Sequence, residues 1–327
     1  MFKGLEFKMA SWIPFQDQMA CEKARSVTRA DLASFQHPNL KITILKDEEI
    51  AFHQVMAIFG RIKQAADEGR RHVIILPNPE PLYASVAFLC NKFRVNCRHL
   101  YTFNMDECAD QDGNIAPETW ENSFLFNMKR NFYAKLDPDL RPLESQIVGP
   151  TNANFAHYGK MIEDLGGADV CYGGIGWSGH VAYIEPGSDA FPPLPMDEWI
   201  KIGPRVVTLT PFTILQNCLL EDTGISGDWS SMPPKGATIG PKEYMGARLR
   251  SSWNGFMCGA SQVSWQRFTM RLAITAKPTP LVPSTMLQMG PSELFINESL
   301  AADIKPDVVT DLAWHTDIKL LDYMGNT

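Results

Sequence analysis

Three residues of types suited to proton transfer follow glycine-rich or strand-like segments. His180 lies shortly after the segment GGIG (Gly173–Gly176), Glu185 follows His180 by five residues, and Asp106 ends an apolar run. A histidine exchanges protons near neutral pH, and a nearby carboxylate can orient its ring. The glycines before His180, Gly174 among them, let the backbone approach a ligand closely. This pattern favours general acid–base chemistry centred on His180.

These residues also have an ordinary structural interpretation. A single histidine is more often a satisfied structural residue than a catalyst, and Asp106 at the end of a strand would also suit the cap of the next helix. The spacing His-x4-Glu is not that of a zinc protease, and the glycines do not form the dinucleotide-binding pattern GxGxxG. We therefore expect neither a metal nor an organic cofactor.

Strand-like and helical segments alternate along the chain and must position these residues. Strands are expected at Leu40–Asp47, His72–Pro77, His99–Glu107, Ala168–Gly176, Arg205–Thr210 and Glu293–Glu298, and helices at Glu48–Glu68, Leu82–Phe93 and Trp120–Leu136. Such alternation predicts an α/β, Rossmann-like fold with a doubly wound, mainly parallel sheet and helices on both faces. Ligands bind at the carboxyl ends of strands in open parallel sheets. The loops expected to meet at that edge are Asn78–Pro81, Asn104–Glu107 and Gly173–Glu185.

The order of the segments also predicts the organisation of the chain. Residues 1–40 are interpreted as an N-terminal extension that packs on one α/β domain spanning residues 41–327. The stretch Asp222–Lys242 is rich in glycine, serine and proline, which is typical of a long loop. Long loops in compact domains often serve as functional lids.

Composition argues against several classes of protein. The net charge of −7 disfavours a nucleic-acid partner, which would require a basic face. No apolar run is long enough to cross a membrane, and the N-terminal residues lack the apolar core of a secretory signal. The seven cysteines are odd in number and have no CxxC spacing, which favours a reducing compartment. We therefore expect a cytoplasmic protein that acts on a small molecule.

Two segments resemble signature sequences of glucosamine-6-phosphate deaminases. They are FNMDE (Phe103–Glu107) and GGIGWSGHVAYIEPGS (Gly173–Ser188), which are close to the family patterns FNMDEY and GGxGxDGHIAFNEP. Further similarities in family order are SFLFNMKRNFY (Ser123–Tyr133), TLT (Thr208–Thr210), ATIG (Ala237–Gly240) and PSTMLQ (Pro283–Gln288). The resemblance implies the deaminase/isomerase type of fold, which also houses 6-phosphogluconolactonases and the sugar-sensing domains of some transcription regulators.

The resemblance also implies a reaction. Asp106 would be the general base that moves a proton between C2 and C1 of an open-chain amino sugar. His180 would assist ring opening by passing a proton to the ring oxygen, and Glu185 would orient His180 and tune its basicity. The outcome would be aldose–ketose isomerisation with loss of ammonia and without a cofactor. Many deaminases are oligomeric, so the resemblance adds the expectation of a homo-oligomer.

The chain departs from the family pattern around the histidine and after the TLT segment. Ser178 stands where the family has an aspartate two residues before the histidine. Trp177 fills a position that is usually small or polar, where it would stack on a sugar face or simply pack. The family's phosphate arginine is missing, with Leu219 near its position, and Lys235 replaces the family's lysine with a shift of one residue.

The phosphate turn departs further. The family's glycine-rich LPTGGTP is replaced by LPNPEP (Leu76–Pro81), in which Pro79 has no N–H to donate and Glu80 brings a negative charge. Each lost hydrogen bond to a charged group is worth roughly 1.5–3 kcal/mol. We therefore expect Asn78 and Glu80 to bind a hydroxyl or an ammonium group of a sugar that lacks an ordinary 6-phosphate. The full set of expected substrate-binding residues is Asn78, Glu80, Gly174, Trp177, Ser178 and Lys235.

Three functions are compatible with this pattern. The retained Asp106, His180 and Glu185 favour an active deaminase or isomerase. Ser178 and the altered phosphate turn favour a sugar-binding or regulatory protein on the same fold, although no helix-turn-helix is evident in the first 40 residues. A sugar lactonase would keep the histidine but would not require FNMDE.

Overall fold

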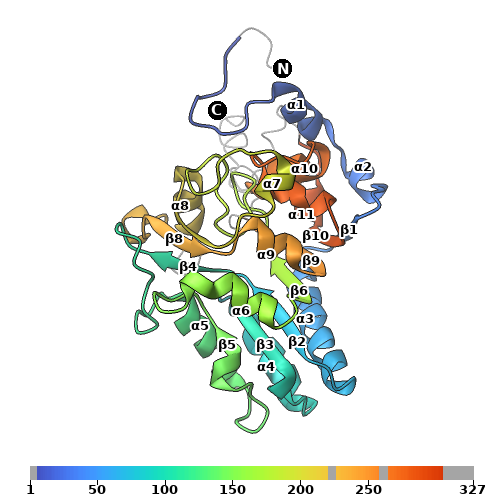
Figure 1. Cartoon of the computed structure of the whole chain (residues 1–327). Coiled ribbons are helices and arrows are strands. Elements are labelled where there is room, and N and C mark those ends of the chain that lie inside the picture. The colour runs from blue at the N-terminus through green and yellow to red at the C-terminus, as the bar shows by residue number, and fades with distance from the viewer. Residues whose placement is uncertain (1–5, 220–225, 258–263, 305–327) are drawn as a thin grey trace, which may run out of the picture.

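The computed structural model describes residues 6–219, 226–257 and 264–304. Its larger sheet has seven strands within these ranges, all paired in parallel, in the order β1-β10-β9-β6-β2-β3-β5 (Figure 1). The strands are β1 (Leu40–Leu45), β2 (His72–Leu76), β3 (Leu100–Asn104), β5 (Ile147–Val148), β6 (Val170–Gly173), β9 (Leu249–Asn254) and β10 (Ser292–Asn297). This confirms the predicted parallel α/β fold.

A smaller antiparallel sheet corrects part of the sequence prediction. It consists of β4 (Asp106–Ala109), β8 (Lys235–Thr238) and β7 (Arg205–Thr208), in that order. The expectation that residues 205–210 continue the parallel series is therefore wrong. The ends of β7 are exposed, whereas β2 in the larger sheet is buried throughout. The expected long loop Asp222–Lys242 contains β8, while its residues 222–225 lie outside the described residues.

Met105 links the two sheets. Its N–H donates to the Leu76 carbonyl of the larger sheet at 2.7 Å, and its carbonyl accepts from the Ile239 N–H, just after β8, at 3.0 Å. The expected single strand at residues 99–107 is therefore two strands, β3 and β4. Asp106 lies where the chain passes from one sheet to the other.

Helices cover both faces of the larger sheet, as the sequence predicts. They are α1 (Gln18–Ser26), α2 (Arg29–Ala33), α3 (Ile50–Asp67), α4 (Tyr83–Lys92), α5 (Phe124–Asn131), α6 (Tyr158–Asp164), α7 (Met196–Trp199), α8 (Pro211–Asn217), α9 (Pro241–Gly246), α10 (Gln266–Thr275) and α11 (Glu298–Ala301). The helix expected at residues 120–136 is shorter, because Ser123 caps α5 and a 3-10 turn follows it. Among the described residues, none of these helices combines the length and apolarity needed to cross a bilayer.

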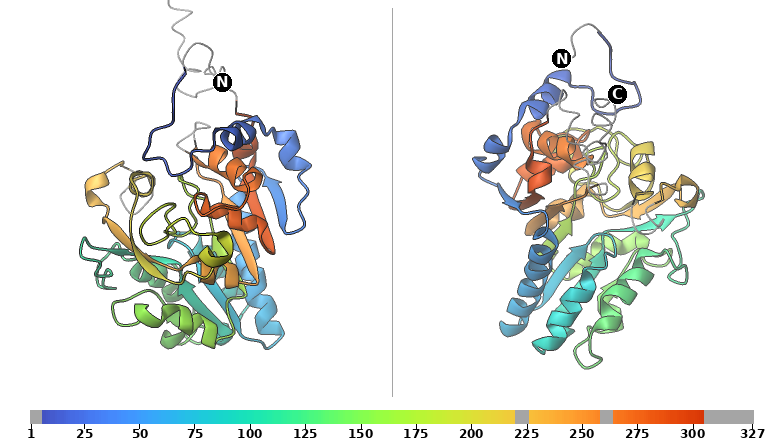
Figure 2. Two further views of the ribbon diagram at one scale, coloured as in Figure 1. Left: turned by 45° about the horizontal axis from the view of Figure 1, so that its top comes forward. Right: turned by 180° about the vertical axis from the view of Figure 1, so that it is seen from behind.

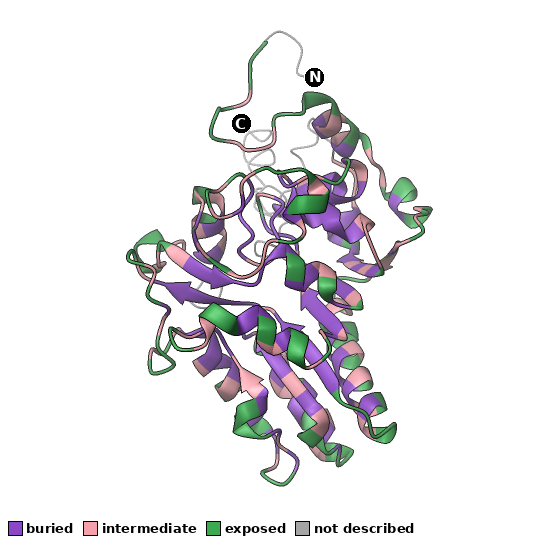
Figure 3. Ribbon diagram, in the orientation of Figure 1, coloured by how far each residue is buried: buried purple, intermediate pink, exposed green. Residues whose placement is uncertain are grey.

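The alternation of side chains along β2 divides the core into two. Val73 and Ile75 pack in the cluster that includes α6 and α10, whereas Ile74 and Leu76 pack in the cluster that includes α3 and α4. The helices α3, α4 and α5 lie side by side over the second face (Figure 2). The strands between the layers are largely buried (Figure 3). Because β2 is apolar on both faces, it has the composition of a central parallel strand.

The N-terminal residues pack on the C-terminal part of the fold, with α1 against α10. Arg271 of α10 is fully buried, and its guanidinium donates to the carbonyls of Val27 at 2.9 Å and Ala301 at 2.8 Å. Backbone carbonyls thus satisfy this buried cation and tie the N-terminal segment to α11. The domain boundary at residue 40 stays a prediction.

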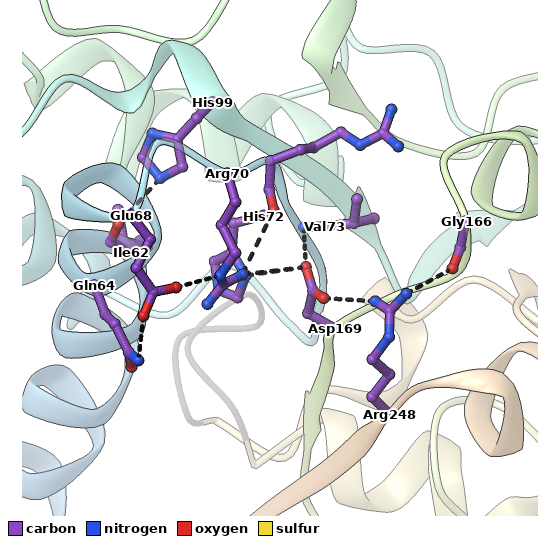
Figure 4. Close-up of polar contacts among 11 residues, drawn as sticks. Ile62, Gln64, Glu68, Arg70, His72, Val73, His99, Gly166, Asp169 and Arg248 are labelled. Atoms are coloured by element: carbon purple, nitrogen blue, oxygen red, sulfur yellow. Dashed lines mark hydrogen bonds and ion pairs between the residues drawn. The ribbon is translucent and has the colours of Figure 1, made fainter.

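Asp169 joins three strands at the amino edge of the larger sheet (Figure 4). Its carboxylate accepts from the Val73 N–H at 2.8 Å and from Arg248 at 2.5 Å, and it lies 3.2 Å from Nδ1 of His72. Burial lowers the pKa of His72 to about 4, although Asp169 acts in the opposite direction. His72 is therefore neutral in the folded protein near pH 7.

Candidate active site

A cavity of about 530 Å³ lies at the carboxyl edge of the larger sheet. The loops after β9, β6, β2 and β3 line it, so the predicted meeting of the polar loops at one edge is confirmed. Five of the predicted site residues line this cavity: Asn78, Glu80, Asp106, Gly174 and His180. A second hollow of about 820 Å³ beside α6 contains none of the predicted residues.

Asp106 is a buried carboxylate that accepts a hydrogen bond from the backbone of the segment after His180. Its Oδ1 accepts from the Tyr183 N–H at 3.1 Å. Burial raises the pKa of Asp106 to about 7, while hydrogen bonds from Thr238 and Tyr183 act in the opposite direction. A base whose pKa lies near the working pH is the most effective proton carrier. Asp106 therefore has the electrostatic setting of a general base.

Glu107, the neighbouring carboxylate, has a structural role that the sequence did not reveal. It is fully buried and accepts from the Ser123 hydroxyl and from the N–H groups of Phe124 and Leu125, all at 2.9 Å. It also accepts from the Cys108 N–H at 3.0 Å. Ser123, Phe124 and Leu125 form the N-terminus of α5, where a negative charge is favourable. Glu107 thus anchors α5 to β4 and is not a cavity group.

His180 lies in a space that a side chain on Gly176 would fill. A Cβ atom added to Gly176 would stand 1.9 Å from Nε2 of His180. Nδ1 of the ring contacts the Ser178 hydroxyl at 2.9 Å and the Thr213 hydroxyl at 3.2 Å, while Nε2 makes no hydrogen bond within the described residues. Burial lowers the pKa of His180, and Glu185 acts in the opposite direction. The two hydroxyls thus fix Nδ1 of the ring, and His180 lines the cavity.

Glu185 reaches His180 only through other side chains. Its two carboxylate oxygens accept from the Thr210 N–H at 3.1 Å and from the Thr210 hydroxyl at 3.0 Å. The Thr210 hydroxyl lies 3.5 Å from the Thr213 hydroxyl, which contacts His180. The expected orientation of His180 by Glu185 is therefore indirect and passes through the first turn of α8, where Thr210 is the N-cap.

The other predicted substrate-binding residues lie outside the cavity wall. The Trp177 ring is exposed and stacks on the lining residue Trp265 with a centroid distance of 5.7 Å, but Trp177 is not itself a lining residue. The Ser178 hydroxyl contacts His180 instead of facing the cavity. Lys235 begins β8, where it pairs with Ala109 and Thr208, and it is not a lining residue. Direct contact of these three side chains with a substrate stays a prediction.

Several cavity and support residues were not predicted from the sequence. Thr213 could have been suspected from the threonine-rich run TLTPFT. Tyr183 lines the cavity, and Gly236 leaves room for its ring, since an added Cβ would stand 2.3 Å from it. The remaining unpredicted group, Gln54, Trp253, Phe256 and Trp265, comes from segments about 200 residues apart in the chain. No local motif connects those segments.

The described part of the cavity wall is acidic. Glu80 and Asp106 line it, and no lysine or arginine is found among its described lining residues. Leu219 lines the cavity near the position expected for a phosphate arginine. Phosphate is normally held by charge-assisted hydrogen bonds from arginine or lysine.

Solved structures with the same fold define the class of protein. A monomeric glucosamine-6-phosphate deaminase superposes with a TM-score of 0.62 at 18% identity, covering 82% of this chain and 100% of its own. The 6-phosphogluconolactonase from Leishmania guyanensis superposes with a TM-score of 0.53 at 14% identity, covering 84% and 99%. The chain therefore shares its fold with both kinds of enzyme.

Sequence relatives narrow the class to a family. Glucosamine-6-phosphate deaminase 2 of Giardia intestinalis is 28% identical over 70% of this chain and 79% of its own length. The glucosamine-6-phosphate deaminase of Porphyromonas gingivalis is 30% identical over 58% of this chain and 68% of its own length. No family model matches the chain. The chain belongs to the glucosamine-6-phosphate deaminase family, as the two signature segments predict.

Proposed function

We propose that the protein is a divergent amino-sugar deaminase that isomerises an aldose to a ketose and releases ammonia. The observation that carries this proposal is that Asp106 and His180 line one cavity, with burial raising the pKa of Asp106 to about 7. His180 offers Nε2 for the proton transfer that opens the sugar ring. Asp106 then moves a proton from C2 to C1, which converts the C2 amine into an imine. Water adds to C2 of this imine and ammonia leaves, so that C2 becomes the ketone carbon.

The proposal includes a substrate without a 6-phosphate. A phosphate in this cavity would meet Glu80 and no lining lysine or arginine among the described residues. Asn78 and Glu80 instead suit a hydroxyl or an ammonium group, since both side chains accept hydrogen bonds. The deaminase names of the relatives support the reaction, while the cavity supports the change in substrate.

The test is ammonia release and ketose formation across a panel of amino sugars with and without phosphate. Asp106→Asn and His180→Asn should each lower kcat by roughly 10²–10⁴-fold, the usual contribution of a general acid or base. His53→Asn, at an exposed histidine outside the cavity, is the matched control. Equal ammonia release by wild type and both cavity variants would contradict the proposed roles.

A non-catalytic sugar-binding protein is the second candidate. Ser178, which contacts His180 where the family has an aspartate, favours it, because a hydroxyl does not stabilise a histidinium as a carboxylate does. Saturable sugar binding by calorimetry with no ammonia from any amino sugar would support this candidate over the enzyme.

A further inference from the structure

The cavity extends beyond the groups that the proposed reaction uses. Its lining residues follow β3, β2, β6 and β9, which are consecutive neighbours in the larger sheet. Neighbouring strands are about 4.8 Å apart, so the edge from β3 to β9 spans about 14 Å. Asp106 lies at the β3 end of this edge. The side chains that follow β9 therefore form a separate part of the cavity wall.

The β9 end is formed by Gln54, Trp253, Phe256 and Trp265, which we call the aromatic end. Its rings are fixed by stacking: Phe256 lies on Trp265 at 3.8 Å between centroids, and Trp253 lies on Phe295 at 3.9 Å. The Phe256 N–H also donates to the Gln266 side chain at 2.9 Å. Ring positions held in this way give a rigid apolar surface with little entropy to lose on binding.

One polar side chain at the aromatic end lacks a hydrogen-bond partner within the described residues. The Gln54 side chain is only 9% exposed and lines the cavity, yet it makes no hydrogen bond there. Buried polar groups are normally satisfied, so this amide points to a ligand that supplies its partners.

A rigid ring surface beside a neutral amide suits a sugar ring better than a phosphate. The apolar C–H face of a pyranose packs on aromatic rings, and its hydroxyls pair with amide groups. We infer that the substrate is a disaccharide or longer glycan with an amino sugar at its free reducing end. The reducing-end unit lies at Asp106 and His180, and the next unit lies at the aromatic end. This inference rests on the proposed deaminase function, because that reaction starts at a free C1.

The linkage between the two sugars follows from the same chemistry. C1 must be free for ring opening, and C2 must carry the amino group that leaves. The second sugar is therefore joined through a hydroxyl elsewhere on the reducing-end unit. A β-1,4-linked glucosamine disaccharide meets these conditions and serves as the test substrate.

The test compares kcat/KM for ammonia release from this disaccharide and from glucosamine. Wild type should prefer the disaccharide at least tenfold, and Phe256→Ala and Gln54→Leu should each lower that ratio about tenfold. Phe52→Ala, at an exposed phenylalanine of α3 outside the cavity, is the matched control and should keep the ratio. Equal kcat/KM values for the two sugars in wild type would overturn the inference while leaving the deaminase function intact.

Calorimetry with the disaccharide alditol, which cannot react, separates the two claims. If no amino sugar releases ammonia, the deaminase function fails. Binding of the alditol to wild type that Phe256→Ala weakens tenfold, with Phe52→Ala unaffected, would still support the second sugar site. Absence of alditol binding to the folded wild-type protein would overturn it.

Discussion

At the residue scale, the site depends on how Nδ1 of His180 is held without the family's aspartate. The hydroxyls of Ser178 and Thr213 lie 2.9 and 3.2 Å from Nδ1. The Thr213 hydroxyl also contacts the Thr210 hydroxyl, which donates to the Glu185 carboxylate. The carboxylate of Glu185 can only accept, so it favours a Thr210 hydroxyl that donates toward it. We therefore propose that Thr213 is a positioning residue through which Glu185 acts on His180.

Replacing Thr213 tests this indirect link. Thr213→Val keeps the shape of the side chain but removes the hydroxyl, and should lower kcat about tenfold, the rough value of one hydrogen bond to a charged group. It should also shift the pH profile assigned to His180. Thr213→Ser restores the hydroxyl and should recover most of the rate. A similar loss of kcat in both variants, with an unshifted profile, would show a packing role only.

Asp106 makes the rate depend on pH near neutrality. With its pKa raised to about 7, the carboxylate is the active form, so kcat/KM should fall about tenfold for each pH unit below 7. A pH–rate profile that stays flat down to pH 5 would contradict this.

The raised pKa of Asp106 also predicts how the stability of the protein depends on pH, and replacing Asp106 tests whether this residue is the source. The folded protein binds the Asp106 proton more tightly than the unfolded chain, so this contribution to stability is present below about pH 4 and is lost as the pH rises through 7. Asp106→Asn should therefore become more stable than wild type by about 2–4 kcal/mol at pH 8, measured by urea unfolding. Equal stability of the two proteins at pH 4 and pH 8 would count against the raised pKa.

At the element scale, composition identified some strands and missed others for physical reasons. The run HVIIL predicted β2, because a parallel strand buried on both faces needs apolar residues throughout. In contrast, β9 has the polar sequence LRSSWN and was not predicted as a strand. It is nevertheless buried, since the Arg250 guanidinium donates to the carbonyls of Ala247 and Pro291 and to the Ser292 hydroxyl. Partners distant in sequence make that burial possible.

The lowered pKa of His72 in β2 predicts how the stability of the folded protein changes in acid. The pKa of His72 is lowered to about 4, so between pH 6.5 and 4 the unfolded chain binds a proton that the folded protein does not. Stability from this group is full above pH 6.5 and should fall by about 2–3 kcal/mol as the pH drops to 4. His72→Gln should remove this part of the pH dependence in urea unfolding.

The control for this prediction is His53→Gln, at an exposed histidine of α3. It should retain the wild-type dependence between pH 6.5 and 4. An unchanged pH dependence in His72→Gln would rule out His72 as its source.

At the scale of the whole molecule, the sequence predicted the meeting of Asp106 and His180 but not the rest of the cavity wall. Asp106 and His180 each lie in a short signature segment that follows a strand. Because the carboxyl ends of parallel strands meet at one edge of the sheet, the topology predicts that the two residues come together. The aromatic end has no such signature, because Gln54 and Phe256 come together only through the packing of α3 beside the turn after β9. An added Cβ on Gly255 in that turn would lie 3.0 Å from Ile50 of α3. Contacts of this kind depend on the complete fold.

The central claim is that this family member acts on an amino sugar without a 6-phosphate. It is tested most directly by kcat/KM for ammonia release from glucosamine and from glucosamine 6-phosphate under the same conditions. Because Glu80 and Asp106 line the cavity without a lysine or arginine among its described lining residues, we predict a ratio of at least tenfold in favour of glucosamine. A preference of tenfold or more for the 6-phosphate would contradict the account.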